Sequence, residues 1–242
     1  MVAIENFLID NIELMKTMNL QTAVKFLLLT LLSTSLLFSC KKIDDEPIVY
    51  GDAKFRVVNA VQGSAAQDFY QGDTKINTSA IAYGESSAYL TVKAGNSTIS
   101  FRSGGGQTVN AINNVGVNTN ESFTVFYTSN LNGAGEIVGY LDNNVTPAAG
   151  KIHLRFLNLG RVLTNAINIS DGNGNSLLNG LGYGIVSEYG VIDANTELKF
   201  SLVGGVTSTV IPGSSFQAGK TYIVWFDAAN TTTAQYHIVA QN

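Results

Sequence analysis

The feature that most constrains the fold is an internal duplication, because the sequence after residue 50 repeats itself at a shift of 99 or 100 positions. Three pairs of blocks recur in the same order: FRVVNA (55–60) with LRFLNL (154–159), AYGESSAY (82–89) with GYGIVSEY (182–189), and ESFTVFYT (121–128) with KTYIVWFD (220–227). Solenoid repeats are shorter, about 20 to 50 residues. The long period therefore predicts duplication of a whole domain.

Each copy has the pattern of short strands separated by turns. Segments rich in β-branched and aromatic residues predict strands at 53–60, 87–94, 97–103 and 122–129, and again at 151–158, 187–192, 197–203, 221–228 and 234–240. The sequences QGDT, KAGN, SGGGQ and NGAGE between first-copy strands have turn chemistry. No segment after residue 40 has a helical period. We therefore expect an all-β chain with two tandem antiparallel β-sandwich domains of immunoglobulin-like type.

The boundary between the copies is expected in the segment DNNVTPAAGK, 142–151, where asparagines, Pro147 and Gly150 favour a short linker. The first sandwich is then expected at 51–145 and the second at 150–242. Residues before 51 are left for other roles.

Composition limits the classes of function. The net charge is −4 and the pI is about 5.1, so the chain has no basic stripe to displace counterions from phosphates, and nucleic acid is not an expected partner. A single cysteine, Cys40, excludes an internal disulfide and a cysteine-based metal site.

The lone cysteine follows the pattern of a bacterial lipoprotein signal. An apolar run at 26–38, preceded by Lys25, would span about 20 Å as a helix, too short for a bilayer core of about 30 Å. Leu37, Phe38 and Ser39 before Cys40 resemble the lipobox. This resemblance implies a signal peptide at 1–39, lipid on Cys40 as the link to the membrane, and a flexible tether at 40–50. The alternative is a buried core cysteine.

Two further features concern processing and export. Acidic residues within 1–14 do not suit a signal peptide, so translation is expected to begin at Met15 or Met18, with Met15 favoured because it adds Lys16. The sequence KKIDDEP (41–47) resembles the export signal of Bacteroidetes-type lipoproteins. We therefore expect an outer-membrane anchor facing the cell surface, with a periplasmic-facing anchor as the alternative.

Both copies resemble a known family. The stretches AKFRVVNAVQGSAAQDFYQGDTKI (53–76) and IAYGESSAYLTVKAGNSTISF (81–101) are similar to the family of domain of unknown function 4397. The likeness covers most of 53–140 and, more faintly, 151–240, where Asn168 replaces Asp68. It implies an extracellular β-sandwich, and it brings no established activity and no catalytic residues.

The sequence contains no recognisable metal-binding motif. Asp171, Asn173 and Asn175 in DGNGNS have the odd-position spacing of a calcium loop. Such a loop needs Gly at its sixth position and Glu at its twelfth, where this chain has Ser176 and Gly182. The segment is expected to be a hairpin turn, and no cofactor is expected.

Catalytic patterns are also missing. His153 and His237 are expected to be isolated, structural residues in strands of the second copy, because the first copy does not preserve them. The serines of GESSA (84–88) lack the closing Gly of a nucleophile elbow, and SGGGQ (103–107) has no helix beside it to bind phosphate. We expect that the protein is not an enzyme.

Aromatic and arginine residues leave two interpretations open. Five tyrosines have two alternative roles, stacking on sugars or packing in the core and across strands, and packing is favoured. They are Tyr70, Tyr83, Tyr89, Tyr183 and Tyr189. Trp225 lies in the apolar run YIVWF and is expected to be buried. Arg56 and Arg155 are expected to anchor a buried network, with Asp68 as a partner in the first copy.

The function expected from the sequence is a surface lipoprotein that binds or adheres, with a glycan or a surface protein as partner. The second hypothesis is an accessory subunit of a surface nutrient-capture assembly. An extracellular enzyme is the third.

Overall fold

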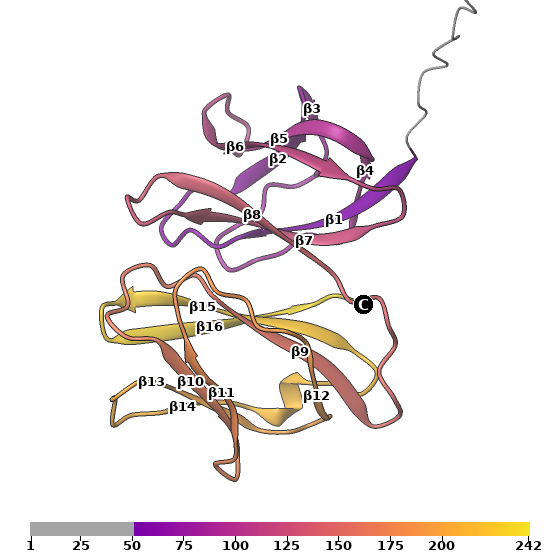
Figure 1. Cartoon of the computed structure of the whole chain (residues 1–242). Helices are drawn as coiled ribbons and strands as arrows, with labels where there is room; N and C mark the ends of the chain where they lie inside the picture. Colours follow the sequence, from indigo (N-terminus) through magenta and orange to yellow (C-terminus); the bar gives the residue numbers. More distant parts are fainter. Residues whose placement is uncertain (1–50) are drawn as a thin grey trace, which may run out of the picture. The chain divides into compact units, whose positions relative to one another are not determined.

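The computed structural model describes residues 51–242, which lie in one compact unit that begins at Val49. The first sandwich contains eight strands (Figure 1): β1 (Asp52–Asn59), β2 (Gln67–Gln71), β3 (Thr74–Lys75), β4 (Leu90–Lys93), β5 (Gly95–Ser103), β6 (Val109–Val117), β7 (Ser122–Ser129) and β8 (Gly135–Leu141).

The second sandwich follows with the same order of strands: β9 (Lys151–Asn158), β10 (Ile167–Asp171), β11 (Ser176–Leu181), β12 (Gly190–Asp193), β13 (Leu198–Leu202), β14 (Thr209–Ile211), β15 (Thr221–Asn230) and β16 (Thr233–Ala240). A 3-10 turn, η2 (Gly213–Ser215), precedes β15. The predicted all-β fold with two tandem β-sandwiches is confirmed.

Each sandwich is built from two four-stranded sheets. The first has the orders β4-β1-β7-β8 and β3-β2-β5-β6, and the second has β12-β9-β15-β16 and β11-β10-β13-β14. Equivalent strands thus occupy equivalent places, as the duplication requires.

The pairing is not antiparallel throughout. β1 pairs with β7 in parallel, and β9 pairs with β15 in the same way. Between β1 and β7 the chain passes through the other sheet and returns, so that it enters β7 in the direction of β1. Because parallel strands need such a long connection, this pairing could not be predicted from neighbouring turns.

The predicted turns QGDT, SGGGQ and NGAGE connect paired strands, whereas KAGN connects strands that are not paired. β4 ends at Lys93 and β5 begins at Gly95, and the two strands belong to different sheets. Gly95 has a φ of 94°, a conformation that favours glycine and lets the chain cross between the sheets within two residues. Strand β6, which is rich in Asn, was not predicted because this residue has low β-propensity.

Each sandwich has its own apolar core. In the first, Phe69 packs between Phe55 and Phe101, with ring centroids 6.1 Å and 5.3 Å away. In the second, Phe226 contacts Phe200 at 4.9 Å. These rings come from both sheets of each sandwich and hold its two layers together.

The central strands β7 and β15 are buried on both faces. The sheet β4-β1-β7-β8 faces the sheet β12-β9-β15-β16 across a third apolar cluster (Figure 1). Consequently seven successive residues of β15, from Thr221 to Asp227, are buried. The run YIVWF is continuously apolar because its side chains serve two cores, and the predicted burial of Trp225 is confirmed.

Candidate functional site at the junction of the two sandwiches

Equivalent residues of the two copies meet at the junction between the sandwiches. Phe126 of β7 packs edge-on against Trp225 of β15, with ring centroids 6.1 Å apart. These two residues are 99 positions apart, the same shift that relates the copies. The rest of the third cluster is also drawn from equivalent strands and loops: Val58, Ala60, Leu157, Leu159, Ile223 and Val239. Contacts between equivalent residues are the mark of an approximately twofold interface.

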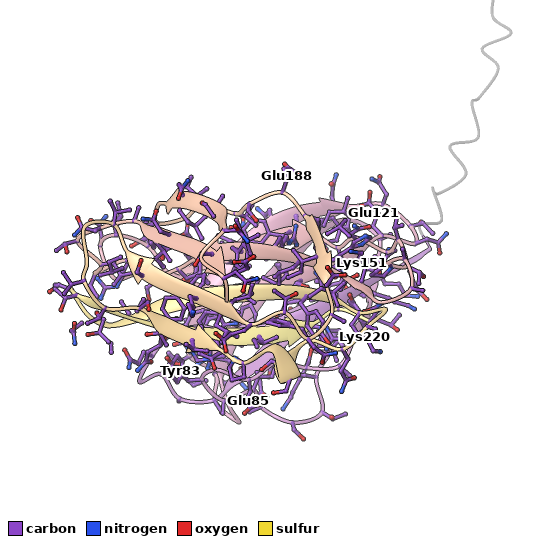
Figure 2. The ribbon with its side chains drawn as sticks, turned by 90° about the horizontal axis from the view of Figure 1, so that it is seen from below. Tyr83, Glu85, Glu121, Lys151, Glu188 and Lys220 are labelled. Atoms are coloured by element: carbon purple, nitrogen blue, oxygen red, sulfur yellow. The ribbon has the colours of Figure 1, made fainter. Side chains whose placement is uncertain are left out.

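Each copy also donates a tyrosine hydroxyl to the other. The Tyr83 hydroxyl donates to the Asp227 carboxylate, and the Tyr183 hydroxyl donates to the Ser129 carbonyl oxygen at 2.7 Å. Figure 2 shows Tyr83 and Glu85 on one side of the molecule and Glu188 on the other, so the equivalent loops 82–89 and 182–189 flank the junction from opposite sides. The junction therefore resembles a homodimer interface within one chain.

A buried carboxylate lies at the end of the junction next to the linker. The Asp142 side chain is 1% exposed and accepts hydrogen bonds from the Tyr89 hydroxyl at 2.6 Å and the Thr124 hydroxyl at 2.8 Å. The Gln241 amide nitrogen donates to the same carboxylate and lies 3.1 Å from the Thr124 hydroxyl oxygen. The Gln241 amide oxygen accepts from the Tyr189 hydroxyl at 2.6 Å. We call these five residues, together with Arg155, the linker-end cluster.

The two arginines extend this arrangement. The Arg56 guanidinium lies 4.5 Å above the Tyr89 ring, and Arg155 lies 4.5 Å above the equivalent Tyr189 ring. Arg155 is almost fully buried and its Nη2 is 3.8 Å from the Asp142 carboxylate. The predicted buried hydrogen-bond network is confirmed only in part: Arg56 is half-buried and donates to the Ser87 carbonyl oxygen at 2.9 Å, whereas Arg155 Nε and Nη2 have no hydrogen-bond partner among the described residues. Cation–π stacking is the element that both copies share.

The predicted partner of Arg56 was wrong. Asp68 pairs with Lys75 at 2.7 Å and accepts from the Gly105 backbone at 2.9 Å, both within the other sheet of the first sandwich. In the second copy the Asn168 side chain accepts a bond from the Gly180 backbone at 2.9 Å. Asp68 therefore stabilises turns of its own sheet and does not pair with Arg56. The separation of Asp68 and Arg56 along the chain gave no indication of this.

Burial controls the protonation of the linker-end cluster. Burial raises the pKa of the Asp142 carboxyl, against the opposing effects of the bonds from Tyr89 and Thr124 and of nearby Arg155. Burial and the neighbouring carboxylate raise the pKa of the Tyr89 hydroxyl, so that it remains a donor. Burial also lowers the pKa of Arg155.

A second polar cluster lies near the β15–β16 turn. Asp227 is 6% exposed, and its Oδ1 is 3.4 Å from His237 Nε2. His237 Nε2 is also 3.4 Å from the Tyr83 hydroxyl, and the imidazole stacks on the Trp225 ring at 3.9 Å. We call Tyr83, Asp227 and His237 the hairpin-end cluster. His237 is therefore not the isolated residue that was predicted, because the loop of the other copy reaches it.

A cleft of about 400 Å³ opens beside the hairpin-end cluster. Both copies line it, and its polar side chains are Gln62, Thr128, Ser129, Arg161 and Asp227. Arg161 is exposed, whereas Asp227 and Thr128 are buried. Hydrogen-bond donors and acceptors thus converge on a cleft of the size that accepts small ligands.

The other candidates have structural roles. Asp171 accepts bonds from the Asn173 and Asn175 backbones within the β10–β11 turn, so DGNGNS is a hairpin turn as predicted. Ser87 Oγ accepts from the Val57 backbone at 3.0 Å, and Ser187 Oγ accepts from the Phe156 backbone at 2.9 Å. Both serines connect a loop to a strand.

His153 and three of the predicted tyrosines contact other residues of the chain. His153 Nδ1 lies 3.1 Å from the Asn143 amide of the linker. The Tyr70 ring is covered by Arg102 at 4.1 Å. The rings of Tyr89 and Tyr189 carry arginines in the same way, so stacking partners from the chain itself occupy these three rings.

Cys40 lies outside the described residues, as do the predicted signal peptide and tether. Within residues 51–242 no group of His, Cys, Asp or Glu side chains is arranged to hold a metal ion. Across the same range no helix has the length and apolar character needed to cross a membrane.

The fold and the junction define a protein of two duplicated β-sandwiches joined through an approximately twofold interface. Residues 53–165 match the model of the family described as Domain of unknown function (DUF4397), so this part of the chain is similar to that family. The match covers the first sandwich and continues through β9, which confirms the resemblance seen in 53–140. No curated protein matches the chain.

Sequence reasoning missed Thr124, Asp142 and Gln241. Asp142 and Gln241 are 99 positions apart, so the shift that relates the copies also pairs these two residues. That equivalence was a usable signal, because residues at an approximate twofold axis contact their own equivalents. The axis itself could not be placed from the sequence.

Proposed function

We propose that the protein is an outer-membrane lipoprotein, anchored through lipid on Cys40 and facing the cell surface, whose two sandwiches form one non-catalytic binding or adhesion module. The anchor rests on the apolar run, on the residues before Cys40 and on the charged tether that follows. Two or three acyl chains on one residue would hold the chain on a membrane almost irreversibly.

The binding role rests chiefly on the cleft beside Asp227. Neither sandwich builds this cleft alone, since residues such as Gln62 and Arg161 come from equivalent loops of different copies. Its convergent donors and acceptors suit a small polyhydroxylated ligand such as one sugar unit of a glycan. Packing through the third cluster would keep its two walls in a fixed relation.

Labelling tests the anchor. Cells that express the full chain and grow on labelled palmitate should yield a labelled mature protein that lacks residues 1–39. Cys40→Ala should lose the label and keep its leader. An unlabelled wild-type chain with an intact leader would contradict the anchor.

A glycan array probed with the full chain tests binding. Arg161→Ala should weaken any bound glycan about tenfold or more, since a charge-assisted hydrogen bond is lost. Lys151→Ala, which alters an exposed ion pair with Asp193, serves as the matched control and should leave binding unchanged. An array without signal would contradict glycan binding. A pull-down from surface-biotinylated cells that recovers an outer-membrane transporter would favour the nutrient-capture hypothesis.

A further inference from the structure

We propose that Thr124 and Gln241 react with each other to form an ester bond that covalently joins the two sandwiches. The linker-end cluster supplies a hydroxyl nucleophile, a carboxylate base, a carboxamide electrophile and a hydroxyl that polarises its carbonyl. All four groups are held together in the junction by hydrogen bonds. This self-modification is separate from the proposed binding function and does not depend on it.

The nucleophile and its base are in contact. The Thr124 hydroxyl donates to Asp142 Oδ1 at 2.8 Å, within the distance at which a general base removes a proton. Thr124 is fully buried, and Asp142 is fixed from its other oxygen by the Tyr89 hydroxyl at 2.6 Å. The raised pKa of Asp142 makes its carboxylate a better proton acceptor than an exposed aspartate would be.

The electrophile is positioned and polarised. The Gln241 amide nitrogen lies 3.1 Å from the Thr124 oxygen, which places the amide group beside the nucleophile. The Tyr189 hydroxyl donates to the Gln241 amide oxygen at 2.6 Å, where negative charge develops in a tetrahedral intermediate. Arg155 Nη2 is buried without a hydrogen-bond partner among the described residues, and its positive charge lies 3.8 Å from Asp142. Tyr189 therefore favours the charge that develops on the amide oxygen, whereas Arg155 favours the ionised form of Asp142 that acts as the base.

The step balances without an oxidant or another reactant. Asp142 takes the proton of the Thr124 hydroxyl while Oγ1 bonds to the Gln241 side-chain carbonyl carbon. The intermediate carries its negative charge on Oε1, beside Tyr189. It collapses when the bond from carbon to Nε2 breaks, and Asp142, which Nε2 already contacts, returns the proton to the leaving nitrogen. The products are one ester and one ammonia molecule.

The burial of the site favours this product. Water is excluded from Thr124, Asp142 and Gln241, so the ester is protected from hydrolysis, while ammonia is lost to the solvent. Holding the reacting groups in contact also replaces a bimolecular encounter with an intramolecular one.

Only one of the two equivalent positions in the two sandwiches has this set of reacting groups. The residue equivalent to Thr124 is Ile223, and the residue equivalent to Gln241 is Asp142 itself. The twofold relation therefore assembles one nucleophile, one base and one amide from two copies. The bond would link β7 of the first sandwich to the residue that follows β16 of the second. It would provide the covalent closure that a chain with a single cysteine cannot obtain from a disulfide.

Peptide mapping of the full chain tests the proposal, because it is independent of processing at the N-terminus. Trypsin cleaves so that Thr124 lies in peptide 103–151 and Gln241 lies in peptide 221–242. The ester predicts that the two peptides are recovered as one species, lighter than their sum by one ammonia. Mild alkaline hydrolysis, which cleaves esters and leaves amide bonds intact, should separate them. Recovery of two unmodified peptides from the wild-type chain would overturn the proposal and leave a hydrogen-bonded network only.

Variants test the assigned roles. Thr124→Val and Asp142→Asn should give two separate peptides, since one lacks the nucleophile and the other lacks the base. Thr124→Ser keeps the hydroxyl and should restore the joined species. Thr128→Val, a buried threonine on the same strand outside the cluster, is the matched control and should stay joined. A joined species that persists in Thr124→Val would refute the assignment of the nucleophile.

Discussion

The two ends of the junction use equivalent positions of the two copies in different ways. At the linker end the equivalent residues Asp142 and Gln241 contact each other. Each also accepts a hydrogen bond from the tyrosine of its own copy, Tyr89 or Tyr189. At the hairpin end Asp227 is equivalent to Thr128 and His237 to Val138, so the carboxylate and the imidazole come only from the second copy.

The difference shows how a duplicated interface departs from symmetry. An aspartate at both equivalent linker-end positions would place two carboxylates in contact, which costs free energy in a buried site. Gln241 replaces one carboxylate with an amide that donates to the other. At the hairpin end the equivalent side chains do not meet, so the second copy acquired Asp227 without this conflict.

The largest effect is expected from removing the linker-end carboxylate. Asp142→Ala leaves Arg155 buried without its counter-charge and should lower the free energy of unfolding by about 3 to 5 kcal/mol. Urea unfolding measures this loss. A Thr124→Val background, which lacks the nucleophile, keeps the proposed ester out of the comparison. Asp52→Ala at the exposed pair with Lys93 is the control and should cost no more than about 1 kcal/mol. Equal losses in the two variants would remove the distinction between buried and exposed carboxylates.

A smaller loss in the free energy of unfolding is expected when both equivalent linker-end positions carry a carboxylate. In the Thr124→Val background, Gln241→Glu replaces the amide donor with a second carboxylate against Asp142 and should cost about 1 to 3 kcal/mol near neutral pH. Repulsion raises the pKa of the pair in the folded chain, so the lost stability should return as pH falls and one carboxyl takes a proton. Thermal unfolding across the acidic range checks the recovery. A loss that is the same at every pH would contradict a repulsive origin.

A still smaller loss in the free energy of unfolding is expected at the hairpin end. Tyr83→Phe removes the hydroxyl that donates to Asp227 and should cost about 1 to 2 kcal/mol, since a buried carboxylate loses a donor. Tyr183→Phe removes the equivalent hydroxyl, whose acceptor is the neutral Ser129 carbonyl, and should cost less, about 1 kcal/mol. Parallel denaturant titrations of the two variants give the difference. The reverse order would show that the charge of Asp227 does not decide the cost.

The smallest effect concerns pH and separates two buried aspartates. Asp142 has a raised pKa, so it binds its proton more tightly in the folded chain; this contribution to stability is present below its ordinary value of 3.8 and is lost as pH rises through the folded pKa. For Asp68, burial opposes ionisation but the bonds from Lys75 and Gly105 lower the pKa overall. Its contribution is present above 3.8 and is lost as pH falls through the lowered pKa.

Replacing each residue by asparagine isolates these slopes. In the Thr124→Val background, the difference in stability that Asp142→Asn makes should shrink as pH rises above 3.8, whereas the difference between wild type and Asp68→Asn should shrink as pH falls below it. Slopes of the same sign for the two variants would contradict the opposite environments of the two carboxyls.

Much of the architecture was determined by the sequence alone. The repeated blocks, the turns rich in Gly, Asn and Asp, and the apolar strands were enough to predict two β-sandwiches and the burial of Trp225. These features are local, since they depend on residues that are close in the chain and on the period of side chains along a strand.

The tertiary structure alone decided the parallel pairs, the twofold junction and both polar clusters. Tyr83 meets His237 across 154 residues, and Thr124 meets Gln241 across 117. No local pattern encodes such contacts, because they depend on which faces of two finished sheets pack together. The sequence determined what each copy is, and packing determined what the two copies make between them.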